Sequence, residues 1–152
     1  MNIKKILLPT DFSKLSLTAA EYAIDLASKY DAEIHLLHVV EKTPPILAIR
    51  SLDLSAEKIR KSIDQHAHQS LDEAVKSISN GKNINIIPKI LTGIDYEEIV
   101  EYSKKNGIDV IVIATHGRTG ILHTLIGSVA EKVIRYAKCP VLVITPKETE
   151  RD

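Results

Sequence analysis

A glycine-containing segment in the second half of the chain combines residue types that bind phosphate. It contains His116-Gly117-Arg118 and ends at Gly127-Ser128, where a helix is expected to begin. Glycine lets backbone amides approach an anion closely, and a helix N-terminus offers N–H groups that have no intrahelical partner. Arg118 would add charge, and the Ser128 hydroxyl would add a hydrogen bond. These residues predict a phosphate-binding loop, although each glycine alone could serve only a turn and Ser128 only a helix cap.

Short apolar runs alternate with segments of helical period along the chain. The runs are nearly continuously apolar, as in parallel strands that are buried on both faces. Each of the four longer segments between them has an apolar stripe at helical spacing. We therefore predict a single α/β domain, a Rossmann-like or flavodoxin-like three-layer sandwich with a five-stranded parallel sheet and four helices. The expected strands span residues 3–8, 33–40, 84–91, 110–114 and 141–144.

The ends of the expected helices have recognisable signals. Asp95 with Glu98, and Ser128 with Glu131, have the spacing of a capping box, so we expect the third and fourth helices to begin there. Gly107 and the pair Asn80-Gly81 are each expected to follow a helix C-terminus, where glycine relieves a left-handed backbone conformation.

Pro88 indicates which strand lies at an edge of the sheet. Proline has no N–H to donate to a neighbouring strand, so the third strand is expected at an edge. The strand order 3-2-1-4-5 puts it there and puts Val141–Ile144 at the opposite edge. An apolar edge strand without a blocking charge tends to pair with another chain. We therefore predict a homodimer that forms through Val141–Ile144.

The same strand order indicates where a ligand would bind. In open parallel sheets, ligands bind beyond the carboxyl ends of the strands, at the point where the strand order reverses. In this order the reversal lies between the first and fourth strands. The loops at residues 9–16 and 115–126 are therefore expected to line the site.

The composition is that of a globular domain. The 152 residues are 44% hydrophobic and 26% charged, with a formal net charge of zero. A neutral chain gives no general attraction to nucleic acid or to an anionic membrane, and no apolar stretch reaches the roughly 20 residues of a membrane helix. Cys139 is the only cysteine, which fits a reducing compartment, so we expect a cytoplasmic protein. The domain is predicted over residues 1–146, followed by a charged tail at 147–152.

The sequence resembles the universal stress protein family along essentially its whole length. The run Ala114-x2-Gly117-x9-Gly127-Ser128 is similar to the family's ATP-binding signature G-x2-G-x9-G-[S/T], with Ala114 in place of the first glycine. Three further blocks look like the family and fall in its order and spacing. They are Ile6-Leu7-Leu8-Pro9-Thr10-Asp11-Phe12-Ser13, Leu36-Leu37-His38-Val39 and Cys139-Pro140-Val141-Leu142-Val143.

This resemblance implies a five-stranded α/β fold, dimers that form through the last strand, and ATP binding. It implies that Asp11 and Val39 hold the adenine end of the nucleotide, although Asp11 could also cap the first helix. It further implies that the phosphates lie at Gly127-Ser128. The implied binding residues are Pro9, Thr10, Asp11, Val39, Ala114, His116, Gly117, Arg118, Gly127, Ser128 and Val129.

Three functions are compatible with these residues. The first is a regulatory stress-response protein that binds ATP, ADP or AMP, with or without Mg²⁺, as a homodimer and acts on a protein partner. The second is a slow ATPase or phosphotransferase in which Asp11, His116 and Arg118 converge near the phosphates, although no residue is evident that would orient the nucleophile. The third is a dimerisation module without a ligand, which the exchange of glycine for Ala114 favours. We expect the first and name no catalytic residue.

The remaining histidines do not predict a metal site. His66 and His68 are two residues apart on a helix and do not share a face, and His35 and His38 point to opposite faces of a strand. We therefore expect no zinc centre.

Overall fold

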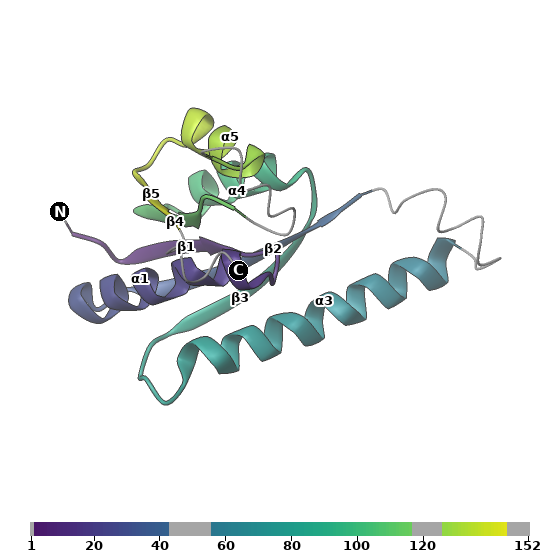
Figure 1. Ribbon diagram of the computed structural model, residues 1–152, viewed down its shortest axis with the longest axis horizontal. Helices are drawn as coiled ribbons and strands as arrows, with labels where there is room; N and C mark the ends of the chain where they lie inside the picture. Colours follow the sequence, from purple (N-terminus) through teal and green to yellow (C-terminus); the bar gives the residue numbers. More distant parts are fainter. Residues whose placement is uncertain (1, 43–55, 117–125, 146–152) are drawn as a thin grey trace.

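Five parallel strands form the central sheet of the computed structural model, in the order β3-β2-β1-β4-β5 (Figure 1). The structure describes residues 2–42, 56–116 and 126–145. The strands are β1 (Lys5–Pro9), β2 (Glu33–Glu41), β3 (Ile86–Gly93), β4 (Val110–Ala114) and β5 (Val141–Ile144). The predicted α/β class, number of strands and sheet order are confirmed.

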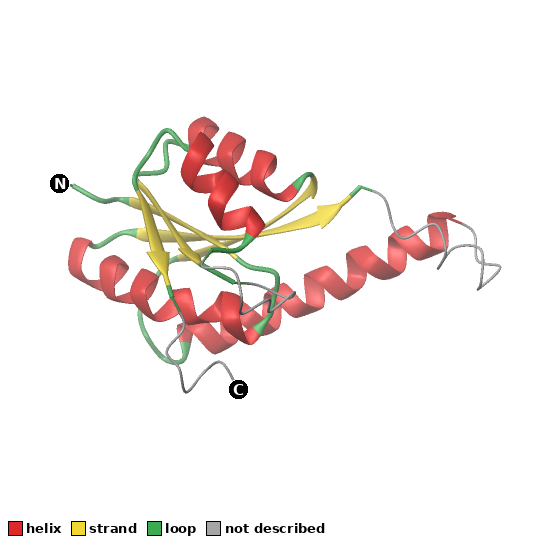
Figure 2. Ribbon diagram, turned by 45° about the horizontal axis from the view of Figure 1, so that its top comes forward, coloured by secondary structure: helices red, strands yellow, loops and turns green. Residues whose placement is uncertain are grey.

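Helices cover both faces of this sheet (Figure 2). In the described segments they are α1 (Lys14–Tyr30), α3 (Ala56–Ser79), α4 (Asp95–Lys105) and α5 (Ser128–Tyr136). Helices α1 and α3 pack on one face, and α4 and α5 pack on the other. The predicted three-layer sandwich is therefore confirmed. None of the helices in these segments is long and apolar enough to cross a bilayer.

Successive strand residues alternate between the two helical layers, which explains why the strands are almost continuously apolar. Ile6 and Leu8 pack with α1 and α3, whereas Leu7 packs with α4 and α5. Each of these side chains is fully buried, and such burial stabilises a fold by about 1.5–3 kcal/mol per side chain. The two cores fix the strands on both sides, so the residues at the strand ends are held in defined positions.

The edge strands lie where the sequence predicts them. Pro88 is exposed and pairs with Leu36 of β2, at the outer edge of the sheet. Two strands begin later than predicted, β1 at Lys5 and β3 at Ile86. At the start of β1, the backbone N–H groups of Lys4 and Lys5 both donate to the Asp109 carboxylate.

The predicted capping boxes do not form. Asp95 and Ser128 are the first residues of α4 and α5, and the residues before them, Ile94 and Gly127, make no side-chain capping bond. The Asp95 carboxylate instead accepts a hydrogen bond from the N–H of Tyr96, the next residue. The first N–H groups of both helices, which have no intrahelical partner, therefore lack the predicted cap.

Helices α3 and α4 end at the predicted glycine-containing positions. Gly107 follows α4 with a φ of +62°, and Ile108 N–H donates to the Ser103 carbonyl at 2.9 Å, as in a Schellman motif. Asn80 and Gly81 follow α3, and both have positive φ.

Candidate functional site

A cavity of about 750 Å³ lies at the carboxyl end of the sheet, and we call it the carboxyl-end cavity. Residues from the ends of β1, β2 and β4, from the N-termini of α4 and α5, and from one face of α3 line it. Nine of the residues implied by the family resemblance are brought together here. They are Pro9, Thr10, Asp11, Val39, Ala114, His116, Gly127, Ser128 and Val129. The other two, Gly117 and Arg118, lie outside the described residues.

The loop between β1 and α1 is held in place by its own short polar side chains. Ser13, and not Asp11, is the N-cap of α1, and its hydroxyl accepts from Ser16 N–H at 3.0 Å. The Asp11 carboxylate accepts from Ser13 N–H at 3.0 Å, which makes a turn just before the helix. Thr10 Oγ1 accepts from Phe12 N–H at 3.0 Å and also hydrogen-bonds the Ser16 hydroxyl. These bonds fix Asp11 at the cavity wall without placing it in the helix cap.

The end of β2 is tied to the same loop by an imidazole. His38 Nδ1 lies 2.8 Å from the Thr10 carbonyl oxygen, which can only accept, so Nδ1 carries the hydrogen. The His38 and Phe12 rings lie with their centroids 4.2 Å apart. The next residue, Val39, faces the layer of α4 and α5. Adjacent residues of β2 thus contribute to opposite sides of the cavity.

The end of β4 is joined directly to the start of α5. Thr115 N–H donates to the Ile144 carbonyl of β5, and the Thr115 carbonyl accepts from Gly127 N–H at 2.6 Å. A Cβ at position 127 would lie 2.5 Å from this carbonyl oxygen, closer than real Cβ atoms come. Gly127 has an ordinary φ of −68°, so close approach, and not backbone conformation, explains the glycine. The N-terminus of α5 is therefore held against the end of β4, facing the cavity.

Ala114 occupies the first glycine position of the signature without strain. Its side chain is 6% exposed and packs in the core between the sheet and α1. The methyl group is thus accommodated in the core, while the residue still reaches the cavity wall.

The ionisable groups that line the cavity are of two kinds. Among the described residues they are carboxylates (Asp11, Glu41 and Asp95) and imidazoles (His38, His66 and His116), with no lysine or arginine. The described part of the chain contains no group of three or more His, Cys, Asp or Glu side chains arranged to hold a metal ion. The neighbouring Thr115 hydroxyl lies 2.8 Å from His116 Nδ1 and orients that ring.

Sequence reasoning missed the contribution of α3. Ile63, His66, Ala67 and Ser70 all line the cavity, and they lie at the three- and four-residue spacing of one helix face. The spacing was visible in the sequence. What was not visible is that the N-terminal turns of α3 extend past the carboxyl end of β2, as both views show (Figures 1 and 2).

A doubly wound parallel sheet with a cavity at the reversal of its strand order defines a class of α/β proteins that bind ligands at the carboxyl edge of the sheet. Within this class, the chain belongs to the universal stress protein family, whose family model matches residues 2–145.

Individual relatives agree with this assignment. The chain is 38% identical to universal stress protein MJ0531 of Methanocaldococcus jannaschii, over 97% of this chain and 85% of the relative. Protein MJ0577 of the same organism has a solved structure with a TM-score of 0.82, at 30% identity over 97% of this chain and 99% of that one.

Two more distant structures share the fold and were solved with nucleotides. One is a universal stress protein in complex with cAMP, with a TM-score of 0.72 at 21% identity, covering 95% of this chain and 98% of that one. The other is a universal stress protein from Archaeoglobus fulgidus in complex with dAMP, with a TM-score of 0.66 at 22% identity, covering 95% and 99%.

Proposed function

We propose that the chain binds an adenine nucleotide (ATP, ADP or AMP) in the carboxyl-end cavity and acts as a nucleotide-dependent regulatory protein in a stress response. The observation that carries the proposal is the contact of Gly127 with the Thr115 carbonyl, which sets an uncapped helix N-terminus against the cavity. Helix N-termini of this kind bind phosphate groups. The volume of about 750 Å³ lies within the usual range for small-molecule sites.

The proposed orientation puts the phosphates at α5 and the adenine toward β1 and β2. Gly127, Ser128 and Val129 form the first turn of α5 and its preceding residue, and Ser128 is exposed, with a hydroxyl that is not used as a helix cap. Asp11 directly follows β1 and Val39 lies in β2, whereas α5 is joined to β4, so in the order of the strands Asp11 and Val39 lie away from the α5 N-terminus, where they would hold the adenine. Family members with cAMP and dAMP support an adenine nucleotide as the ligand.

The ligand is tested by analysing the protein as purified. Acid extraction followed by chromatography is expected to release an adenine nucleotide, and calorimetry of the stripped protein is expected to show binding of ATP, ADP or AMP. Each titration is repeated with and without Mg²⁺, which determines whether the ion takes part. Release of ADP from ATP is followed in the same samples. Steady turnover would assign the enzyme function, whereas no extracted nucleotide and no heat would leave only a dimerisation module.

We further propose that two chains form a homodimer along β5, in a reducing compartment such as the cytoplasm. β5 is an edge strand, and Leu142 on it is 38% exposed. Ile134 and Tyr136 of α5 are also exposed, at 42% and 50%. Unpaired apolar edge strands associate readily. A regulatory protein partner would then bind the nucleotide-bound dimer.

Light scattering tests the dimer. The wild-type mass is expected to be twice the chain mass of 16.8 kDa, and Leu142→Lys is expected to lower it to one chain. Tyr22→Lys is a matched control, because Tyr22 is a similarly exposed apolar residue (43%) on α1. A wild-type protein that is monomeric at micromolar concentration would rule the dimer out.

A further inference from the structure

One face of α3 forms a wall of the carboxyl-end cavity that the family resemblance does not assign. This α3 wall consists of Ile63, His66, Ala67 and Ser70. Farther along the helix, Leu71, Ala74 and Ile78 are buried in the core against the sheet. Different parts of α3 therefore have different contacts. Its C-terminal half packs on the sheet, whereas Ile63, His66, Ala67 and Ser70, nearer the N-terminus, line the cavity.

The α3 wall and the α5 N-terminus lie on opposite sides of the sheet. α3 shares its layer with α1 and with Phe12, whereas α5 shares its layer with α4 and Val39. The cavity passes over the carboxyl edge of the sheet between these layers. A ligand whose phosphates lie at α5 would therefore extend its other end toward α3. In a nucleotide, that end is the base.

The chemistry of the α3 wall suits a purine base. His66 and Ser70 are one helical turn apart, and each can both donate and accept a hydrogen bond, as the edge of adenine requires. Ile63 and Ala67 provide apolar surface beside them, and the Phe12–His38 ring pair offers flat surface on the same side of the sheet. Within the described part of the chain, no hydrogen bond joins the side chain of His66 or of Ser70 to another residue.

We propose that His66 and Ser70 hydrogen-bond the base of the bound nucleotide and are specificity-determining residues of the site. This inference rests on the proposed nucleotide-binding function. His68, two residues beyond His66, provides the contrast. It lies 3.8 Å from Asp64 on the same helix and does not line the cavity, although both histidines are exposed.

The test is calorimetry of His66→Leu and Ser70→Ala with three ligands: adenosine, AMP and inorganic tripolyphosphate. His66→Leu removes both ring nitrogens and is expected to weaken adenosine and AMP equally, by roughly five- to tenfold, the effect of one or two lost hydrogen bonds. Ser70→Ala is expected to weaken both by about threefold. Tripolyphosphate affinity is expected to stay at the wild-type value, because it has no base. His68→Leu is the matched control and is expected to bind all three ligands as wild type does.

The outcomes separate this inference from the function on which it rests. If wild-type protein binds none of the nucleotides, the proposed function fails. If it binds AMP but His66→Leu and Ser70→Ala bind adenosine and AMP as wild type does, only the base contact is overturned. A loss that appears with tripolyphosphate would place His66 at the phosphates and would also overturn the proposal. Thermal unfolding of each variant checks that it is folded. If His66→Leu is unstable, Ser70→Ala still tests the proposal, because alanine is favourable in a helix and this variant is expected to fold.

Discussion

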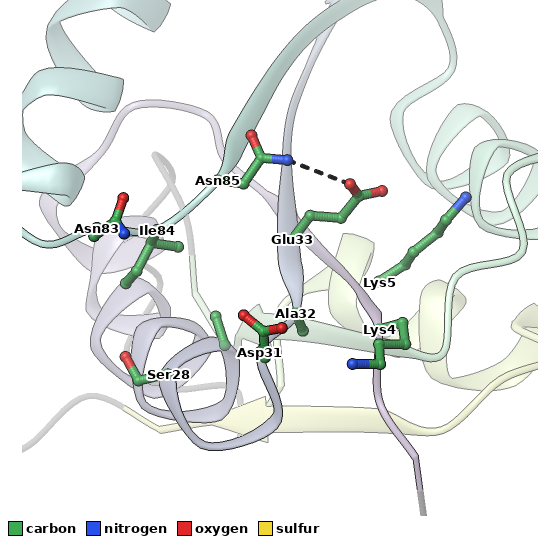
Figure 3. A pocket seen from close by; sticks show the side chains of 10 residues that line it. Lys4, Lys5, Ser28, Asp31, Ala32, Glu33, Asn83, Ile84 and Asn85 are labelled. Carbon is green, nitrogen blue, oxygen red and sulfur yellow. Dashed lines mark hydrogen bonds between the residues drawn. The ribbon is translucent and has the colours of Figure 1, made fainter.

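The two ends of the sheet carry cavities of similar size and opposite character. The carboxyl-end cavity has a volume of about 750 Å³, and a second cavity at the amino ends of the strands, the amino-end cavity, has about 660 Å³ (Figure 3). Lysine, carboxylate and asparagine side chains line the amino-end cavity. They are Lys4, Lys5, Asp31, Glu33, Asn83 and Asn85. By content of charged groups, the amino-end cavity would look like the better binding site.

Most of those groups are already used by the protein itself. Lys4 Nζ donates to the Tyr30 carbonyl, the last of α1, and Lys5 Nζ donates to the Asn106 carbonyl that follows α4. Figure 3 shows the two lysine side chains pointing in different directions, as these separate partners require. Lysines at helix C-termini satisfy carbonyls that have no intrahelical partner.

Glu33 is used in the same way, in a chain of hydrogen bonds that leads into the core. Its carboxylate accepts from His35 Nε2 at 2.9 Å. It also accepts from Asn85 at 3.4 Å, the hydrogen bond that Figure 3 draws. His35 Nδ1 then accepts from the Tyr102 hydroxyl at 2.7 Å. Burial raises the pKa of Tyr102, and the Glu33 carboxylate raises it further, so the phenol remains the donor. In this series of hydrogen bonds, each donor therefore has an acceptor.

The difference follows from the polarity of parallel α/β units. Every such unit brings helix C-termini to the amino end of the sheet and helix N-termini to the carboxyl end. At the amino end, side chains of β1 and β2 satisfy the exposed groups and so stabilise the fold. At the carboxyl end, α5 begins at Ser128, and Gly127 before it provides no side-chain cap, so a ligand can supply the missing partner. Substitutions at the two ends should therefore affect different properties.

Gly127→Val should have the largest effect, and it should appear in binding. The added side chain would overlap the Thr115 carbonyl and push α5 away from the end of β4. Overpacking of this kind lowers folding stability by about 1–3 kcal/mol. Because relief of the overlap moves the α5 N-terminus away from the phosphates, nucleotide affinity measured by calorimetry should also fall, by up to roughly 100-fold.

Gly81→Ala is the control at the other end of the molecule. Gly81 has a φ of +76°, and a Cβ added there would meet no atom within 4 Å, so the substitution causes backbone strain without overlap. It should lower the free energy of unfolding by about 1 kcal/mol and leave nucleotide affinity unchanged. Equal loss of affinity in both variants would contradict the division between the two ends.

Asp109→Ala should have the next largest effect, and it should appear only in stability. The Asp109 carboxylate accepts from the N–H groups of Lys4 and Lys5 at 2.8 and 2.9 Å and so anchors the start of β1. Loss of hydrogen bonds to a charged group should lower the free energy of unfolding in urea by about 2 kcal/mol. Asp109→Asn keeps one oxygen acceptor and should lose less. A variant of either kind that folds normally but binds nucleotide more weakly would contradict the comparison.

The sequence predicted the fold better than it predicted the local contacts. β4 and β5 lie at the predicted residues because a strand buried on both faces is a continuous apolar run, and Pro88 correctly indicated an edge. The capping boxes were wrong because the chain enters α4 and α5 one residue earlier than the spacing of Asp95 and Ser128 implied. Spacing within a segment does not show which residue adopts the first helical conformation.

The site shows the same limit. The loops at the strand ends were predictable, because sheet polarity determines where they gather. The α3 wall was not, because the register of a long helix along the sheet depends on packing between residues distant in sequence, such as Leu71 with Ile34 and Leu36. The predicted domain boundary, the homodimer and the nucleotide itself remain predictions for the experiments above.

The smallest expected effect concerns Cys139, which precedes β5 and therefore lies at the amino end. Burial raises the pKa of its thiol, and a hydrogen bond with the Ser103 side chain only partly offsets this. A raised pKa means that less thiolate is present at a given pH, and the thiolate is the reactive form. Alkylation by iodoacetamide at neutral pH should therefore be severalfold slower in the folded protein than in urea. In the folded protein the rate should still be rising above about pH 8.5, the ordinary thiol pKa. A rate that levels off below that pH would show that the thiol is activated. The amino end of the sheet would then contain a reactive group, contrary to the purely structural role inferred for it.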